Sequence, residues 1–305
     1  MKAQFLISLL FLITACSKTL RPQQLLVDVQ ELSSDKYEGR KTGTTGNLKA
    51  AEYIIKRFEE IGLNQYKGTW KQPFELSDSK RRGKTGQNLI GFIPGKRSEV
   101  IVISAHYDHL GIINGQIYNG ADDNASGVAG LLAMATYFKK NPPEFTLLFV
   151  CFDSEENGLQ GSKAFVKHPP VELNNIILDI NLDMISRADK GEIYACGTYH
   201  YPAFKKYLVS KNPKIRLLLG HDDPKSGIND WTNQSDHYSF YQKNIPFIYF
   251  GVEDHKDYHK PTDDFSRINK EVFLNISDLL IGIVSDIDKQ LSFQKNFRDK
   301  LIMKD

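Results

Sequence analysis

The chain has 305 residues, of which 41% are hydrophobic and 25% charged, the composition of an ordinary globular protein rather than a disordered or fibrous one. With 39 Lys and Arg against 37 Asp and Glu, the formal net charge is only +2, so we expect no nucleic-acid partner. The three cysteines form no Cys-x-x-Cys pair, which leaves His, Asp and Glu to hold any bound metal.

Residues 1–15 are typical of a secretory signal peptide, because a short basic start precedes an apolar run that is too short to span a bilayer. The run ends in Leu-Ile-Thr-Ala-Cys, which resembles the lipobox of bacterial lipoproteins, where cleavage precedes a Cys that is then acylated. We therefore expect a lipid anchor at Cys16, a polar tether over residues 16–24 and a place in the cell envelope, facing the periplasm or the exterior. An ordinary secretory signal with an incidental Cys is the alternative.

Two helices are predicted next. One begins at about Leu25, and the other covers residues 47–61, where apolar residues recur at near-helical spacing and Gly62 ends the pattern. Residues 64–87 are rich in polar and basic side chains. We interpret this stretch as a solvated loop, since no aromatic residues accompany its basic run.

From residue 88 the pattern alternates between strands and helices. Apolar runs typical of buried strands lie at 100–105, 145–152, 176–182 and 246–250, with weaker ones at 193–196 and 215–219. Helices are predicted at 126–140 and 269–289. Such alternation requires crossover connections, so we expect one α/β domain over residues 25–305, with a mostly parallel central sheet flanked by helices.

Four of the apolar runs are each followed by a segment with His or carboxylate residues, and a further acidic segment precedes the helix at 126–140. These segments contain His106, Asp108, Asp123, Glu155, Glu156, Asp183 and His259. Because ligands of open α/β sheets bind beyond the carboxyl ends of the strands, we expect these side chains to lie close together. Arg187 and Lys260 are too few cations for so many carboxylates, so the pattern predicts divalent metal ions.

These segments resemble the successive metal motifs of the M28 peptidases, a family of co-catalytic di-zinc aminopeptidases. The motifs are His106-Tyr107-Asp108, Ala121-Asp122-Asp123-Asn124-Ala125-Ser126-Gly127, Glu155-Glu156, Asn181-Leu182-Asp183-Met184 and Tyr258-His259-Lys260-Pro261. The resemblance runs from residues 35–40 through residues 235–237 to the C-terminal helix, nearly all of the mature chain. It implies the three-layer sandwich of the zinc exopeptidases and removal of N-terminal residues from peptides with a free amino terminus.

Matched motif by motif, the resemblance implies that His106 and Asp183 hold one zinc ion, that Glu156 and His259 hold another, and that Asp123 bridges them. Co²⁺ or Mn²⁺ would suit the same nitrogen and oxygen ligands.

Two roles besides metal binding follow from the same match. Glu155 would be the general base that takes a proton from the attacking water and returns it to the leaving amine. Asp108 would orient His106 through its other ring nitrogen.

Other polar residues near these motifs are assigned no metal. We expect Asp122 to be structural and His109 not to act as a ligand. Asp236 and His237 are expected to support the site from a helix start. His255 is expected at the surface.

Two other functions stay open at this point. The related glutaminyl cyclases are single-zinc acyltransferases on the same scaffold, and the resemblance implies that they lack the first His ligand, so the intact His106-Tyr107-Asp108 motif favours peptide hydrolysis. The other is a non-catalytic binding lipoprotein. The complete ligand set and Glu155 argue against it, because such a protein would be expected to lose at least one of them.

Overall fold

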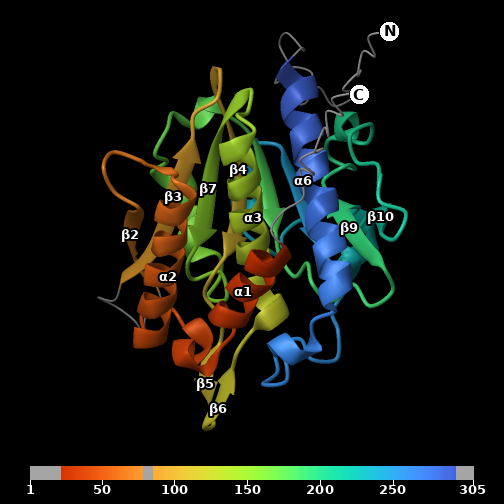
Figure 1. Cartoon of the computed structure of the whole chain (residues 1–305). Coiled ribbons are helices and arrows are strands. Elements are labelled where there is room, and N and C mark those ends of the chain that lie inside the picture. Colours follow the sequence, from red (N-terminus) through yellow and green to blue (C-terminus); the bar gives the residue numbers. More distant parts are fainter. Residues whose placement is uncertain (1–21, 78–84, 293–305) are drawn as a thin grey trace, which may run out of the picture.

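A nine-stranded sheet forms the centre of the computed structural model, which describes residues 22–77 and 85–292 (Figure 1). Its strands are β1 (Asn64–Gln65), β2 (Lys71–Glu75), β3 (Thr85–Ile93), β4 (Arg97–His106), β7 (Phe145–Phe152), β8 (Ile176–Leu182), β9 (Glu192–Cys196), β10 (Arg216–Leu219) and β11 (Phe247–Gly251). Their order is β1-β3-β7-β4-β8-β11-β9-β10, and β2 also pairs with β3. The central strands β7, β4, β8 and β11 are parallel, whereas β3 and β9 join them antiparallel.

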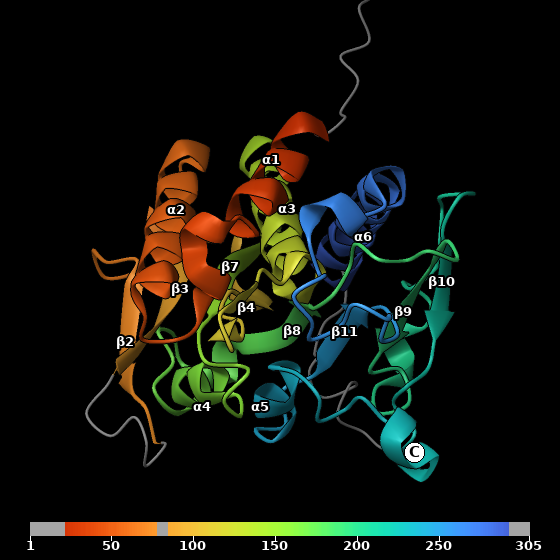
Figure 2. The ribbon, with the colours of Figure 1, turned by 90° about the horizontal axis from the view of Figure 1, so that it is seen from below.

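Helices cover both faces of this sheet (Figure 2). They are α1 (Pro22–Leu32), α2 (Thr45–Ile61), α3 (Gly127–Lys140), α4 (Gln160–Lys167), α5 (His237–Tyr241) and α6 (Lys270–Ser292). Helices α1, α2, α3 and α6 lie on one face, and α4 and α5 lie on the other (Figure 2). The predicted single α/β domain with a largely parallel central sheet is therefore confirmed as a three-layer arrangement.

Strand β4 shows how one apolar run supplies both cores. Successive side chains of a strand point to opposite faces of the sheet. Ile101 and Ile103 pack into the core beneath α3, and Val100 and Val102 pack into the second core on the α4 side. All four are buried. A strand buried on both faces needs a continuous apolar run, which is why this strand and its parallel neighbours are readily predicted.

The boundaries of α2 follow from its terminal residues. The side chain of Thr44 accepts a hydrogen bond from the backbone N–H of Asn47 at 3.3 Å, which caps the first turn. Gly62 adopts the left-handed conformation with φ 79°, and its N–H donates to the carbonyl oxygens of Phe58 and Glu59. The helix thus ends at the predicted glycine and begins two residues before the predicted start.

The described residues 64–77 and 85–87 do not form the solvated loop that the composition of this stretch predicted. The stretch contains β1 and β2, and β3 begins within it at Thr85. Strand β2 pairs antiparallel with β3 and has half-buried and exposed residues along its length. A strand that buries so little needs no apolar alternation, so the usual sequence signal is missing. The basic run at 80–84 lies outside the described residues.

Helix α1 begins at Pro22, three residues before the predicted start. The predicted signal peptide at 1–15 and the predicted anchor at Cys16 lie outside the described residues. Among residues 22–77 and 85–292, no helix combines the length and the apolar character needed to cross a membrane.

Candidate metal centre

Five predicted ligands meet beyond the carboxyl ends of the parallel strands, each from its own segment of the chain. His106 ends β4, Glu156 follows β7 and Asp183 follows β8. Asp123 lies in a π-helical segment, Ala121–Ser126, that leads into α3, and His259 lies in the loop between β11 and α6. The arrangement is the one expected for the switch-point edge of an open α/β sheet.

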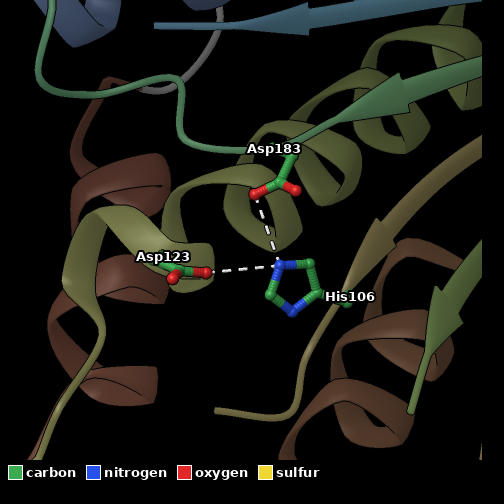
Figure 3. A group of neighbouring side chains, drawn as sticks. All are labelled: His106, Asp123 and Asp183. Carbon is green, nitrogen blue, oxygen red and sulfur yellow. Dashed lines mark hydrogen bonds and ion pairs between the residues drawn. The ribbon is translucent and has the colours of Figure 1, made fainter. Parts of the chain in front are cut away.

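The predicted ligands form two groups that share Asp123. His106 Nε2 lies 3.3 Å from Asp123 Oδ1 and 3.3 Å from Asp183 Oδ1 (Figure 3). His259 Nε2 lies 3.1 Å from Asp123 Oδ2 and 3.3 Å from Glu156 Oε2. The two oxygens of Asp123 therefore face two different pairs of a His and a carboxylate.

The charges of these groups depend on one another. Burial opposes a charge on His259, but hydrogen bonds to Asp123 and Glu156 outweigh it and raise the pKa of this ring to about 10. Burial also opposes a charge on His106, while the neighbouring Asp183 helps to raise its pKa well above the ordinary value. Burial would raise the pKa of Asp123, but the surrounding imidazoles hold it well below its usual range. The carboxylates therefore favour positive charge at this site, which a bound cation can supply.

Glu155 lies next to Glu156 but is held differently. Its backbone N–H donates a hydrogen bond to Asp108 Oδ1 at 3.0 Å. Burial raises the pKa of the Glu155 carboxyl well above its usual value, and nearby carboxylates add to the rise. A carboxyl with a raised pKa beside such a candidate metal centre is suited to accept and return a proton.

Asp108 makes contacts to two neighbouring loops. The closest of its oxygens to His106 Nδ1 is the backbone carbonyl, at 3.2 Å, whereas the carboxylate Oδ1 lies 3.8 Å away. The carboxylate accepts hydrogen bonds from Glu155 N and, at 3.3 Å, from Thr42 Oγ1. Both the backbone and the side chain of Asp108 therefore contribute to the position of residues around the site.

His109 lies inside the candidate centre, although we expected it not to act as a ligand. Its Nδ1 lies 2.7 Å from Glu156 Oε1 and 3.7 Å from Asp123 Oδ2. His109, Asp123 and Glu156 are one of two groups of described residues that are close enough to hold an ion, and His106, Asp123 and Asp183 are the other. The only available signal was the position of His109 one residue after Asp108.

Asp122 and His255 form a contact behind the ligands. Asp122 Oδ1 accepts hydrogen bonds from the N–H and the hydroxyl of Ser186, both at 2.7 Å. Its Oδ2 lies 3.1 Å from His255 Nε2. The structural role expected for Asp122 fits these bonds. The surface position expected for His255 was wrong, because its side chain is 8% exposed against Asp122.

Asp236 and His237 lie at the start of α5 and are fully buried. Burial raises the pKa of Asp236 to about 7, against the opposing charge of His106. Burial lowers the pKa of His237 to about 3, and its Nε2 lies 3.1 Å from the carbonyl oxygen of Trp231. Asp236 therefore lies within electrostatic range of the centre, while His237 is a neutral ring of the interior.

The two basic residues singled out near the strand ends have other partners. Arg187 Nη1 donates to Asp257 Oδ2 at 3.0 Å, and Lys260 Nζ donates to the backbone oxygen of Lys256. These bonds therefore do not pair either residue with the carboxylates of the predicted ligands. Arg40 is a buried cation whose charge interacts with Asp123 and Glu156, and the sequence did not indicate it as a site residue.

Comparison with known proteins agrees with this geometry. The model of "Peptidase family M28" matches residues 88–284. Aminopeptidase YwaD of Bacillus subtilis is 27% identical over 230 residues, which cover 72% of this chain and 48% of that protein. The alkaline phosphatase isozyme conversion protein of Escherichia coli is 30% identical over 168 residues, 50% of this chain and 49% of that protein. The chain thus spans about half the length of these relatives.

Solved structures share the fold at low identity. BSAP, a zinc aminopeptidase from Bacillus subtilis, superimposes with a TM-score of 0.70 at 17% identity, covering 94% of this chain and 99% of that one. The Bacteroides thetaiotaomicron glutaminyl cyclase gives 0.70 at 18% identity, with 88% and 98% covered. The fold alone does not separate these two activities. The family match covers more than half of the sequence, and on that basis the chain belongs to peptidase family M28.

Proposed function

We propose that the protein is a metallo-aminopeptidase that hydrolyses the first peptide bond of peptides at a centre of two zinc ions. The observation that carries the proposal is the position of Asp123, whose Oδ1 faces His106 and whose Oδ2 faces His259. A carboxylate that presents its oxygens to two separate ligand pairs suits a bridge between two cations.

The donor set fits zinc. In this proposal His106 and Asp183 hold one ion, Glu156 and His259 hold the other, and Asp123 bridges them. Imidazole nitrogen and carboxylate oxygen are ligands that Zn²⁺ accepts, and Co²⁺ or Mn²⁺ can share them. When bound, the ions supply a water of near-neutral pKa and polarise the substrate carbonyl.

Glu155 acts as the general base in this proposal. It takes a proton from the attacking water and returns it to the leaving amine. Its raised pKa and the fixed position of its backbone against Asp108 support this role. Asp108 supports His106 through the oxygens that face the ring nitrogen Nδ1.

The substrates in this proposal are peptides with a free α-amine. Glu155 and Asp183 border the centre with carboxyl groups that can hold an ammonium group. N-acetylation removes that charge, so an acetylated peptide should not be cleaved.

Metal analysis and a panel of aminoacyl substrates test the proposal. We expect two zinc ions per purified chain, cleavage of free peptides and no cleavage of their N-acetylated forms. Equal rates on acetylated and free peptides would contradict aminopeptidase activity. A stoichiometry of one ion or none would contradict the two-metal centre.

Glutaminyl cyclisation is a second candidate, because a glutaminyl cyclase shares the fold. Two separate groups of candidate ligands that share Asp123 favour two ions over one. A peptide with N-terminal Gln distinguishes the activities: an aminopeptidase releases free Gln, whereas a cyclase releases ammonia and leaves the chain otherwise intact. A non-catalytic binding lipoprotein would do neither.

Anchoring through Cys16 remains a proposal that rests on the sequence of the first sixteen residues. We expect wild-type protein in the membrane fraction and Cys16→Ser either released from it or unprocessed. Wild-type protein that is fully soluble after fractionation, with an unmodified amino terminus, would contradict the anchor.

A further inference from the structure

Arg40 places a buried guanidinium beside the metal centre. The residue is 1% exposed, and its N–H groups donate to four backbone carbonyl oxygens. Nε donates to Tyr107 at 2.9 Å, Nη1 donates to Leu32 at 2.7 Å and to Asn119 at 2.6 Å, and Nη2 donates to Gly120 at 2.9 Å. One rigid group therefore connects three segments of the chain.

Two of these segments carry metal ligands of the proposed centre. Tyr107 follows His106 directly. Gly120 directly precedes the π-helical segment Ala121–Ser126, which contains Asp123. The guanidinium thus bonds to the backbone next to one ligand and to the backbone three residues before another. These are the two ligands whose side chains lie 3.3 Å apart.

The backbone of Arg40 is itself fixed. Its carbonyl oxygen accepts hydrogen bonds from His109 N–H at 3.3 Å and from Asn47 Nδ2 at 3.1 Å. The preceding Gly39 has φ 67°, and a Cβ there would lie 2.4 Å from the carbonyl oxygen of Tyr118 in the hairpin β5 (Gly111–Ile113) and β6 (Gln116–Tyr118). Only glycine permits this close approach, so the turn Asp35–Arg40 holds Arg40 against the ligand loops.

The charge of Arg40 persists at neutral pH. Burial lowers the pKa of its guanidinium to about 10, and the surrounding carboxylates, among them Asp123 and Asp263, oppose that change. Lysine could keep the charge but not the contacts, because an ammonium lacks the planar fork that reaches several acceptors at once.

We propose that Arg40 is a positioning residue that sets the spacing of His106 and Asp123 before metal binds. The proposal rests on the two-zinc centre of the proposed function. Groups that hold ligands in place without touching the ion change metal affinity by about 10–100-fold when they are removed. Arg40 acts on the backbones of two ligand segments rather than on one side chain, so its loss should loosen both.

Zinc affinity of Arg40→Lys tests the proposal, with Arg57→Lys as the matched control. Arg57 is also a buried arginine, 8% exposed, and its Nε donates to Asp28 Oδ1 at 2.9 Å between α2 and α1, away from the ligand loops. Zinc dissociation constants are measured by competition with a chromophoric chelator, at a temperature where circular dichroism shows each variant folded. We expect at least about tenfold weaker zinc binding for Arg40→Lys and a change within about twofold for Arg57→Lys.

The outcomes separate this proposal from the proposed function. Unchanged zinc affinity in Arg40→Lys, or an equal loss in Arg57→Lys, would overturn the positioning role while the wild type still binds two ions. A wild type that binds no zinc would overturn both. Should Arg40→Lys not fold, hydrogen exchange on the metal-free wild type decides. The amide of His109, which donates to the Arg40 carbonyl oxygen, should then be protected before zinc is added, and exchange that becomes slow only with zinc would overturn the proposal.

Discussion

Glu155 and Glu156 are adjacent in sequence yet face different surroundings. The Glu156 carboxylate lies between His109 Nδ1, at 2.7 Å, and His259 Nε2, at 3.3 Å. Glu155 is anchored through its backbone N–H to Asp108. Neighbouring residues in a loop direct their side chains differently, so one carboxylate can bind metal while the other faces the substrate.

This difference predicts opposite behaviour for two conservative variants. Glu155→Gln should keep close to two metal ions per chain, while kcat falls by about 10²–10⁴-fold, the usual contribution of a general base. KM should change much less, because proton transfer matters mainly in the transition state. Glu156→Gln should instead lose metal, since a neutral amide is a poor replacement for a carboxylate ligand.

Metal content and steady-state kinetics of the two variants, measured side by side, check the assignment. Each variant is the control for the other, because both remove one carboxylate charge from the same loop. Near wild-type activity in Glu155→Gln, or loss of metal from it rather than from Glu156→Gln, would contradict the roles proposed here.

Some residues of the site could be read from the sequence and others could not. His106 and Asp183 end or follow apolar runs, so their place at the sheet edge follows from the strands that precede them. Arg40 bonds to Gly120, and His109 to Glu156, across long separations in the chain. No local sequence pattern predicts such contacts, because they depend on how loops from different parts of the fold meet.

At the scale of elements, the four central parallel strands were the most predictable, whereas β3 is largely buried and was not predicted. Strands β4, β7, β8 and β11 are covered on both faces, and their continuous apolar runs located them to within about three residues. Strand β2 is partly exposed along its length, and its composition predicts a loop instead. Helix α5 has only five residues, too few for a clear 3.6-residue period, yet its start at Asp236 and His237 agrees with the helix start expected there.

Two glycines in helical surroundings predict stability changes of opposite sign. Gly62 ends α2 at φ 79°, a conformation that costs alanine about 1 kcal/mol, although an added Cβ would have room at 3.4 Å from Lys139 Cε. Gly282 lies inside α6, is exposed, and has open space around an added Cβ. Gly62→Ala should therefore lower the free energy of unfolding by about 1 kcal/mol, and Gly282→Ala should raise it by a similar amount.

Urea unfolding of both variants with the wild type measures these changes. Each substitution adds the same single methyl group, so the sign depends on the backbone conformation of the site alone. A Gly62→Ala variant as stable as the wild type would contradict the left-handed cap, and a destabilised Gly282→Ala would contradict an unstrained helical position in α6.

At the scale of the whole molecule, the proposed centre joins parts of the fold that the sheet and the helices position separately. Its ligands come from the ends of three strands, from the start of α3 and from the loop before α6. Zinc that contacts all of them binds the folded state and not the unfolded chain, in which these segments are far apart. Binding must therefore stabilise the native state by mass action.

Removal of metal should lower the melting temperature. At free zinc about 100 times the dissociation constant, the stabilisation is about 2.7 kcal/mol, which corresponds to about 5 °C for a chain of this size. Calorimetry in zinc buffers and in excess EDTA measures the difference. Asp123→Asn should lose most of the zinc-dependent rise, because it weakens both ligand groups at once, whereas Arg57→Lys should retain it. Equal melting temperatures of the wild type with zinc and with EDTA would show that no ion connects these segments.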